Sequence, residues 1–334
     1  MDGVCLGAGL PYWLNTSTMT KIPFFALPAL FSCCFFLTCF SLRAQKSIWN
    51  TPAAYLGQKP PGDKPEAFAL DLVMKNDTFS MDRVAFSDDG TEFYYPSNNT
   101  WFSSTAAAVR CFKYRNGKWE GPFTVFPQYY APTFSMDGKT LYLLGGADRR
   151  RDTTHAYVFQ SHRTADGGWT KPEVYLRTRF GSYDFMPTLS GTCYLASNVH
   201  PDKIRDYSDY DVSTMRVSGG DTVVKSLGEP LNTPGFDGDF YVARDESYII
   251  ISNKETKSFE CELAISFRRP DGNWTAPASL GPAINDRVAH RWGEYVSPDG
   301  KYLFYSTGTS PKDCHIVWVR WDTLLEKLRR ENLR

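Results

Sequence analysis

The chain has 334 residues, of which 42% are hydrophobic and 15% aromatic, enough to bury a substantial core and to exclude a disordered polymer. Its 37 basic residues balance 37 acidic ones, and the longest basic run is Arg149-Arg150-Arg151, so the charge pattern excludes a nucleic-acid partner. The abundance of Phe, Tyr and Trp favours strands, while 25 Gly and 21 Pro supply turns, so composition favours an all-β protein.

The N-terminal segment has the pattern of an export signal. Residues 22–42 are apolar or small, follow Lys21 and end just before Ala44. This pattern predicts a secretory signal peptide over 1–44, with translation starting at Met19 and cleavage after Ala44. The segment is also long enough to span a membrane, so its retention as an anchor stays the alternative. We expect a periplasmic or secreted protein with no stable membrane span after cleavage.

Residues 45–81 precede a repeated unit that organises the rest of the chain. Each unit has an apolar stretch, a tight turn rich in Asp and Gly, and a second apolar stretch, which is typical of a β-hairpin. The unit recurs about every 50 residues, the spacing of propeller blades. Its anchor positions are Ser87, Ser135, Ser190, Ala243 and Ser297.

A third apolar stretch and a second turn follow each hairpin. The second turn carries Gly, Trp and Pro at 116–122, 166–172 and 271–277, whereas the third unit has no Trp over 219–230. We interpret Trp119, Trp169 and Trp274 as packing residues. Four antiparallel strands per unit predict a five-bladed β-propeller over 82–321.

The last unit leaves the ring of blades incomplete. After Trp321 the residues 322–334 are charged and helix-prone, so they supply no fourth strand. The alternating segment 64–74 is predicted to complete the fifth blade and close the ring. Six blades stay possible if the segment before Asp77 forms more than one strand.

The repeat resembles a known family. The string Ser-Pro-Asp-Gly-Lys-Tyr-Leu-Phe at 297–304, with 271–285 and 55–69, is similar to the WD-like, TolB-type β-propeller repeat proteins of bacterial envelopes. The resemblance covers most of the chain after the signal and implies an exported protein. The resemblance implies little about activity, because many members of the family have no assigned chemistry and the better-known ones act as binding platforms. Two units depart from the motif, the shortened third and the fourth, in which Glu246 replaces the turn Gly.

The sequence contains no hydrolase elbow, zinc motif, phosphate loop or dinucleotide fingerprint. Polar residues nevertheless gather ahead of the anchors, in loops that meet at one mouth of a propeller channel. They form our candidate ligand-binding site: Asp82, Asp184, Asp237, Asp239, His290, Arg291, Trp292 and Glu294. Common turn chemistry is the alternative explanation of the Asp residues.

We therefore predict an exported, non-catalytic propeller that binds a protein or a glycan of the cell envelope, without a cofactor. The alternative is a glycoside hydrolase that uses Asp82, Asp239 and Glu294 as acid, base or nucleophile. A structural Ca²⁺ held by channel carboxylates stays open. Four cysteines follow the signal, and their wide spacing favours free thiols over disulfides: Cys111, Cys193, Cys261 and Cys314.

Overall fold

The computed structural model describes most of the chain after the predicted signal. By internal contacts the chain divides into two units, Met1–Ala44 and Gln45–Arg334, and all described residues belong to the second. The predicted signal peptide therefore lies outside the described residues. These residues are 47–74, 79–101, 105–145, 156–178, 181–198, 210–218, 221–253 and 260–333.

Strands dominate this part of the chain. In chain order the elements are the 3-10 helix η1 (Ala54–Gly57), β1 (Glu66–Ala67), α1 (Leu70–Val73), β2 (Phe79–Ser80), β3 (Ala85–Phe86), β4 (Glu92–Asn98), β5 (Ala108–Arg115), β6 (Lys118–Pro127), β7 (Tyr129–Phe134), β8 (Thr140–Gly145), β9 (Ala156–His162), β10 (Glu173–Thr178), β11 (Ser182–Pro187), β12 (Cys193–Ser197), β13 (Asp211–Ser218), β14 (Asp221–Ser226), β15 (Phe240–Val242), β16 (Tyr248–Asn253), β17 (Glu262–Phe267), β18 (Ala278–Ser279), β19 (His290–Val296), β20 (Tyr302–Gly308), β21 (His315–Arg320) and α3 (Asp322–Asn332).

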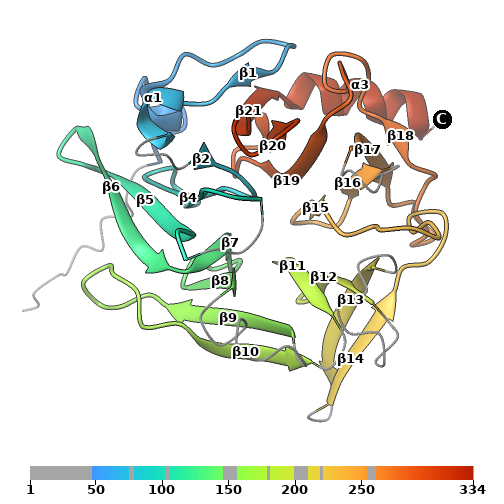
Figure 1. Cartoon of the computed structure of the whole chain (residues 1–334). Coiled ribbons are helices and arrows are strands. Elements are labelled where there is room, and N and C mark those ends of the chain that lie inside the picture. The colour runs from blue at the N-terminus through green and yellow to red at the C-terminus, as the bar shows by residue number, and fades with distance from the viewer. Residues whose placement is uncertain are drawn as a thin grey trace, which may run out of the picture. The chain divides into compact units, whose positions relative to one another are not determined.

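The described strands form five antiparallel sheets, which Figure 1 shows arranged around a common axis. This arrangement confirms the predicted five-bladed β-propeller. Blade 1 contains β2 to β6, and β3 pairs with β4 beside β2. Blade 2 contains β7 to β10, blade 3 contains β11 to β14, and blade 4 contains β15 to β18. Blade 5 contains β19 to β21 and β1.

The N-terminal strand closes the ring as predicted. Strand β1 pairs antiparallel with β21, so Glu66 lies opposite Trp318 (Figure 1). The strand is shorter than predicted, because Ala69 adopts a left-handed backbone with φ 48° and α1 follows. Phe68 explains the break: its fully buried ring packs against Phe304 and Trp318, with centroid distances of 5.1 and 5.0 Å. The prediction of one strand over 64–74 was wrong beyond Ala67.

An earlier part of the N-terminal segment also joins the first blade to the last. The Tyr55 hydroxyl donates to the Asp299 carboxylate of blade 5 at 2.7 Å. The Trp49 indole donates to the Asp88 carbonyl of blade 1 at 2.8 Å. Trp119 of blade 1 donates in turn to the Ala53 carbonyl at 2.8 Å. The two ends of the ring are therefore held by side chains as well as by β1.

The repeated hairpin turn has a specific side-chain clip. In blade 2 the Ser135 hydroxyl donates to the Asp137 carboxylate at 2.7 Å and accepts from the Thr140 amide at 2.9 Å. The same two contacts occur at Ser87 and Ser297. The clip explains the motif, because Ser and Asp satisfy turn groups while Gly supplies the positive φ, 69° at Gly138.

Blade 4 keeps this turn geometry without Gly. Glu246 occupies the Gly position with φ 59°, a conformation that is strained for a residue with a side chain. Its buried carboxylate accepts hydrogen bonds from Thr188, Ser190 and Tyr194 of blade 3 and pairs with Arg268. The substitution of Gly by Glu246 therefore strains the backbone of the turn, but it adds a contact between blades 3 and 4.

The C-terminal tail is the helix α3, as its composition indicates. Leu328 is buried in the core of blades 4 and 5, and the Arg329 guanidinium lies 5.9 Å from the Phe267 ring centre. Just before the helix, the Trp321 indole donates to the Tyr248 hydroxyl of blade 4 at 3.0 Å.

Among the described residues, no helix is both long and apolar enough to cross a membrane. The cysteines Cys111, Cys193, Cys261 and Cys314 are free thiols.

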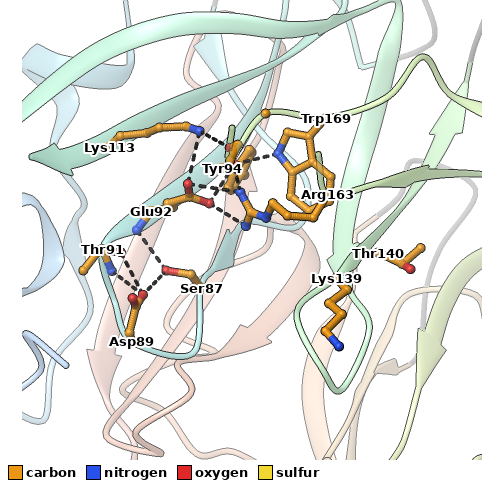
Figure 2. A network of polar contacts seen from close by, with 12 residues as sticks. Ser87, Asp89, Thr91, Glu92, Tyr94, Lys113, Lys139, Thr140, Arg163 and Trp169 are labelled. Atoms are coloured by element: carbon orange, nitrogen blue, oxygen red, sulfur yellow. Dashed lines mark hydrogen bonds and ion pairs between the residues drawn. The ribbon is translucent and has the colours of Figure 1, made fainter. Parts of the chain in front are cut away.

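Tryptophans of the second turns pack between neighbouring blades. The Trp169 indole of blade 2 donates to the Tyr94 hydroxyl of blade 1 at 2.8 Å, and the Arg163 guanidinium lies 4.0 Å from its ring centre. Figure 2 shows Trp169, Tyr94 and Arg163 around the Glu92 carboxylate, which Lys113 also approaches. The predicted packing role of Trp169 is confirmed.

Candidate functional site

The innermost strands carry bulges or breaks near the channel. Asp82, Asp184 and Gly293 have φ values of 68°, 58° and 66°, and the pairing register shifts beside Asp184 and Gly293. Bulges reorient the side chains around them. Gly293 is required by contact as well as conformation, because a Cβ there would lie 2.4 Å from the Asp82 carbonyl carbon.

Arg83 crosses the axis from blade 1. Its side chain is fully buried, forms an ion pair with Asp184 of blade 3 and donates to the Phe240 carbonyl of blade 4 at 2.9 Å. It also donates to the Thr133 hydroxyl of blade 2 at 3.3 Å. Asp184 accepts a further hydrogen bond from the Phe240 amide at 3.0 Å. One guanidinium therefore ties four blades together at the centre.

Glu294 of blade 5 completes this central cluster. It is 0% exposed, its Oε1 accepts from the Ser252 hydroxyl at 2.8 Å, and its Oε2 has no hydrogen-bond partner among the described residues. Burial, with the nearby charge of Asp184, raises the pKa of Glu294 to about 8. Burial and Asp184 also raise the pKa of Asp82 to about 7. Burial raises the pKa of Asp184, and the positive charge of Arg83 partly offsets this upward shift.

A second arginine closes the axis near the hairpin turns. Arg244 of blade 4 pairs with Asp88 of blade 1 at 2.8 Å and donates to the Met136 carbonyl of blade 2 at 3.3 Å. Between Arg83 and Arg244 lies a cavity of about 60 Å³, which Tyr241 also lines. Ordinary ligand pockets measure roughly 300–1,000 Å³, so this part of the axis has no room for a sugar.

His290 and Trp292 lie in an aromatic cluster on β19. Their rings stack with centroids 3.9 Å apart, and Trp101 of blade 1 packs edge-on against both. Burial lowers the pKa of His290 to about 3, so its imidazole is neutral at physiological pH. The two residues join blade 5 to blade 1.

Other predicted site residues organise loops. Arg291 is buried and donates to the carbonyls of Ile284, Cys261 and Arg287 at 3.1, 2.9 and 2.8 Å. Asp237 accepts from the Thr233 amide at 2.6 Å, and burial raises its pKa to about 7. The contact of Asp237 with Thr233 is the turn chemistry that was the alternative explanation of the Asp residues. Asp239 is buried directly before β15.

The structure thus brings together Asp82, Asp184 and Glu294 from the predicted set. The structure also places Arg83 in this cluster, a residue that the sequence analysis missed. Its position just before the inner strand β3 was the sequence signal that could have found it. Within the described residues, no group of three or more His, Cys, Asp or Glu side chains is placed to hold a metal ion.

A groove between blades 3 and 4 was also missed. Its volume is about 830 Å³, within the range of ligand pockets. One wall is formed by side chains of β13 and β14, among them Arg216 and Lys225, and the other by the second turn of blade 4, including Arg269 and Trp274. The absence of Trp from the third unit was the only sequence signal that these interfaces differ.

No family model matches the chain, and no curated protein matches it. Among solved structures, it is similar to TolB from Acinetobacter baumannii, with 15% identity and a TM-score of 0.41 over 71% of this chain and 54% of that one. A thermostable family-43 glycoside hydrolase has 15% identity and a TM-score of 0.41 over 72% of this chain and 88% of that one.

Prolyl oligopeptidase B from Galerina marginata, bound to a 35mer substrate, has 15% identity and a TM-score of 0.39 over 68% of this chain. This chain spans 30% of that protein and 54% of TolB. The strand order of the chain itself therefore identifies it as a five-bladed β-propeller.

Proposed function

We propose that the chain is an exported, non-catalytic propeller that binds a protein or a glycan of the cell envelope. The observation that carries this proposal is the state of the axial carboxyl groups. Asp184 and Glu294 are 2% and 0% exposed, and Asp184 is engaged by Arg83. Both groups are enclosed within the ring, which leaves the loops and grooves of the blades as the surface for recognition.

A glycoside hydrolase is the second candidate, and one observation favours it. With a pKa of about 8, Glu294 is mostly protonated at neutral pH, as a general acid must be. Glycoside hydrolysis, however, needs two carboxyl groups that flank the scissile bond. The burial of Glu294 and the ion pair of Asp184 oppose such access.

The two candidates are separated by one set of measurements on the full chain, produced with its own leader. A glycan array and a pull-down from envelope extract test binding, and a panel of chromogenic glycosides tests hydrolysis. Our proposal predicts a captured ligand and no turnover. Turnover that disappears in Glu294→Gln would instead establish the hydrolase.

Export is tested separately by cell fractionation. We expect the mature chain in the periplasmic or secreted fraction, with its N-terminus directly after Ala44. Recovery in the cytoplasm with an intact leader would contradict this part of the proposal.

A further inference from the structure

We propose that the groove between blades 3 and 4 binds an acidic saccharide, whose carboxylates face the basic side chains of the groove. This inference rests on the proposed binding function and gives it a place and a ligand class. It concerns the rim of the ring rather than the axis, where Asp82, Asp184 and Glu294 meet.

The groove results from a difference between neighbouring blades. In blade 4 the outermost strand β18 has two residues, whereas β14 of blade 3 has six and β6 of blade 1 has ten. The short β18 leaves the outer side of blade 3 uncovered. Thr214 and Arg216 of β13, and Val223 and Lys225 of β14, therefore line the groove.

The charge of the groove is positive. Arg216, Lys225 and Arg269 line it and form no ion pair with any carboxylate of the described residues. Of the two acidic residues in the lining, Glu246 is already engaged by Arg268 and by blade 3. Glu229 alone remains to balance three cations, so the groove favours an anion.

Trp274 supplies a second, independent observation. It is 8% exposed and lines the groove, yet its indole N–H makes no hydrogen bond within the described part of the chain. The indoles of Trp119, Trp169 and Trp321 all donate to protein oxygen atoms. The Trp274 N–H is not among the enclosed polar atoms of the described residues, so it is accessible from the groove and can donate to an oxygen of a bound ligand.

The lining mixes polar and apolar groups. Besides the cations, the walls carry the hydroxyl groups of Thr192, Thr214 and Ser226, the amide of Asn273, and the apolar side chains of Val223, Leu227 and Trp274. The polar groups suit the hydroxyls of a sugar and the indole suits its less polar face, so we assign a saccharide and test an acidic peptide against it. The volume of about 830 Å³ accommodates a short oligosaccharide.

Isothermal titration calorimetry of the full chain with tetragalacturonate tests the inference. Its methyl ester, which has the same shape without charge, is the matched ligand control. We expect binding that weakens at high salt, and at least tenfold weaker binding of the ester. Lys225→Gln and Arg216→Gln should each weaken binding of tetragalacturonate about fivefold to tenfold, because each removes one charged hydrogen-bond donor.

Lys118→Gln is the matched protein control, because Lys118 is an exposed lysine on β6, the corresponding strand of blade 1. It should leave binding unchanged. Equal binding of acid and ester, or equal loss in Lys118→Gln and Lys225→Gln, would overturn the inference. Tighter binding of hexaglutamate than of tetragalacturonate would overturn the saccharide assignment in favour of an acidic peptide.

The outcomes also separate this inference from the proposed function. A ligand captured on the array whose binding is unaffected by Lys225→Gln and Arg216→Gln would leave the binding function intact and refute the groove. Glycoside turnover would refute the binding function itself.

Discussion

Buried carboxyl groups lie in two regions of the propeller, the axis and the interfaces between blades. The two regions differ in the number of cations that surround each carboxyl group. At the axis, Asp82, Asp184 and Glu294 surround the single guanidinium of Arg83. At the interface of blades 1 and 2, the carboxylate of Glu92 alone meets two cations (Figure 2).

The pKa shifts follow this difference in partners. Burial opposes ionisation in both regions. At Glu92 the hydrogen bonds and charge of Arg163, with the charge of Lys113, outweigh burial and lower the pKa. At Glu294 no cation is close enough to do so, and the pKa rises to about 8. Burial alone therefore does not decide the charge state; the count of donors and cations around the group does.

The largest effect should come from breaking the ion pair at the axis. Arg83→Met leaves Asp184 buried without its cation, and we expect a loss of about 3–5 kcal/mol in the free energy of unfolding. Urea denaturation measures it. The double variant Arg83→Met/Asp184→Asn removes both charges and should recover part of the loss. A single variant as stable as the wild type would show that Arg83 does not brace the ring.

The corresponding change between blades should cost less. Glu92→Gln removes the charge that Arg163 and Lys113 share, but both cations are partly exposed and can be hydrated. We expect a loss of about 2–3 kcal/mol by urea denaturation. Glu120→Gln, on exposed β6 of the same blade, is the control and should change stability by less than about 0.5 kcal/mol. A loss equal to that of Arg83→Met would remove the distinction between the regions.

The sequence predicts the blades well because their signal is local. Ser135, Asp137 and Gly138 lie within one turn, and their contacts with each other produce the hairpin. Ring closure by the N-terminal segment is predictable because the last unit has three strands and needs a fourth from elsewhere in the chain. The end of β1 at Ala67 could not be predicted in this way, because it depends on burial of Phe68 among rings from distant blades.

The candidate site was predictable only in part for the same reason. Asp82, Asp184 and Glu294 precede comparable anchors, so symmetry alone suggests that they meet. The ion pair of Arg83 with Asp184 joins residues 101 positions apart, and no local pattern contains it. The groove depends on what two neighbouring blades fail to provide, a long β18 and a Trp in the third unit, so it appears only when the blades are assembled.

The axis predicts a pH dependence with a definite sign. Because the folded pKa of Glu294 lies above its unfolded value of about 4.5, the folded state binds the extra proton between these values. Stability should therefore fall as pH rises from about 4.5 through 8, by at most about 1.4 kcal/mol per pH unit for this group. Glu294→Gln, which is always neutral, should flatten this slope and be about 2 kcal/mol more stable than the wild type at pH 6, with a larger difference at pH 8. Urea midpoints from pH 5 to 8.5 measure the effect, and parallel curves for both proteins would contradict it.

The interface of blades 3 and 4 should show the opposite sign. Burial opposes ionisation of Glu246, but hydrogen bonds from Ser190, Thr188 and Tyr194 outweigh it and lower the pKa. The stability contributed by this group is present above the unfolded pKa of about 4.5 and is lost as pH falls through the folded value. Glu246→Gln should therefore cost about 1 kcal/mol at pH 7, and the cost should shrink toward pH 3. The same urea titration extended to acid pH measures it, with Glu229→Gln as the exposed control from the same groove. A cost that grows in acid would mean that Glu246, like Glu294, is protonated in the folded protein, and the contrast between axis and interface would not hold.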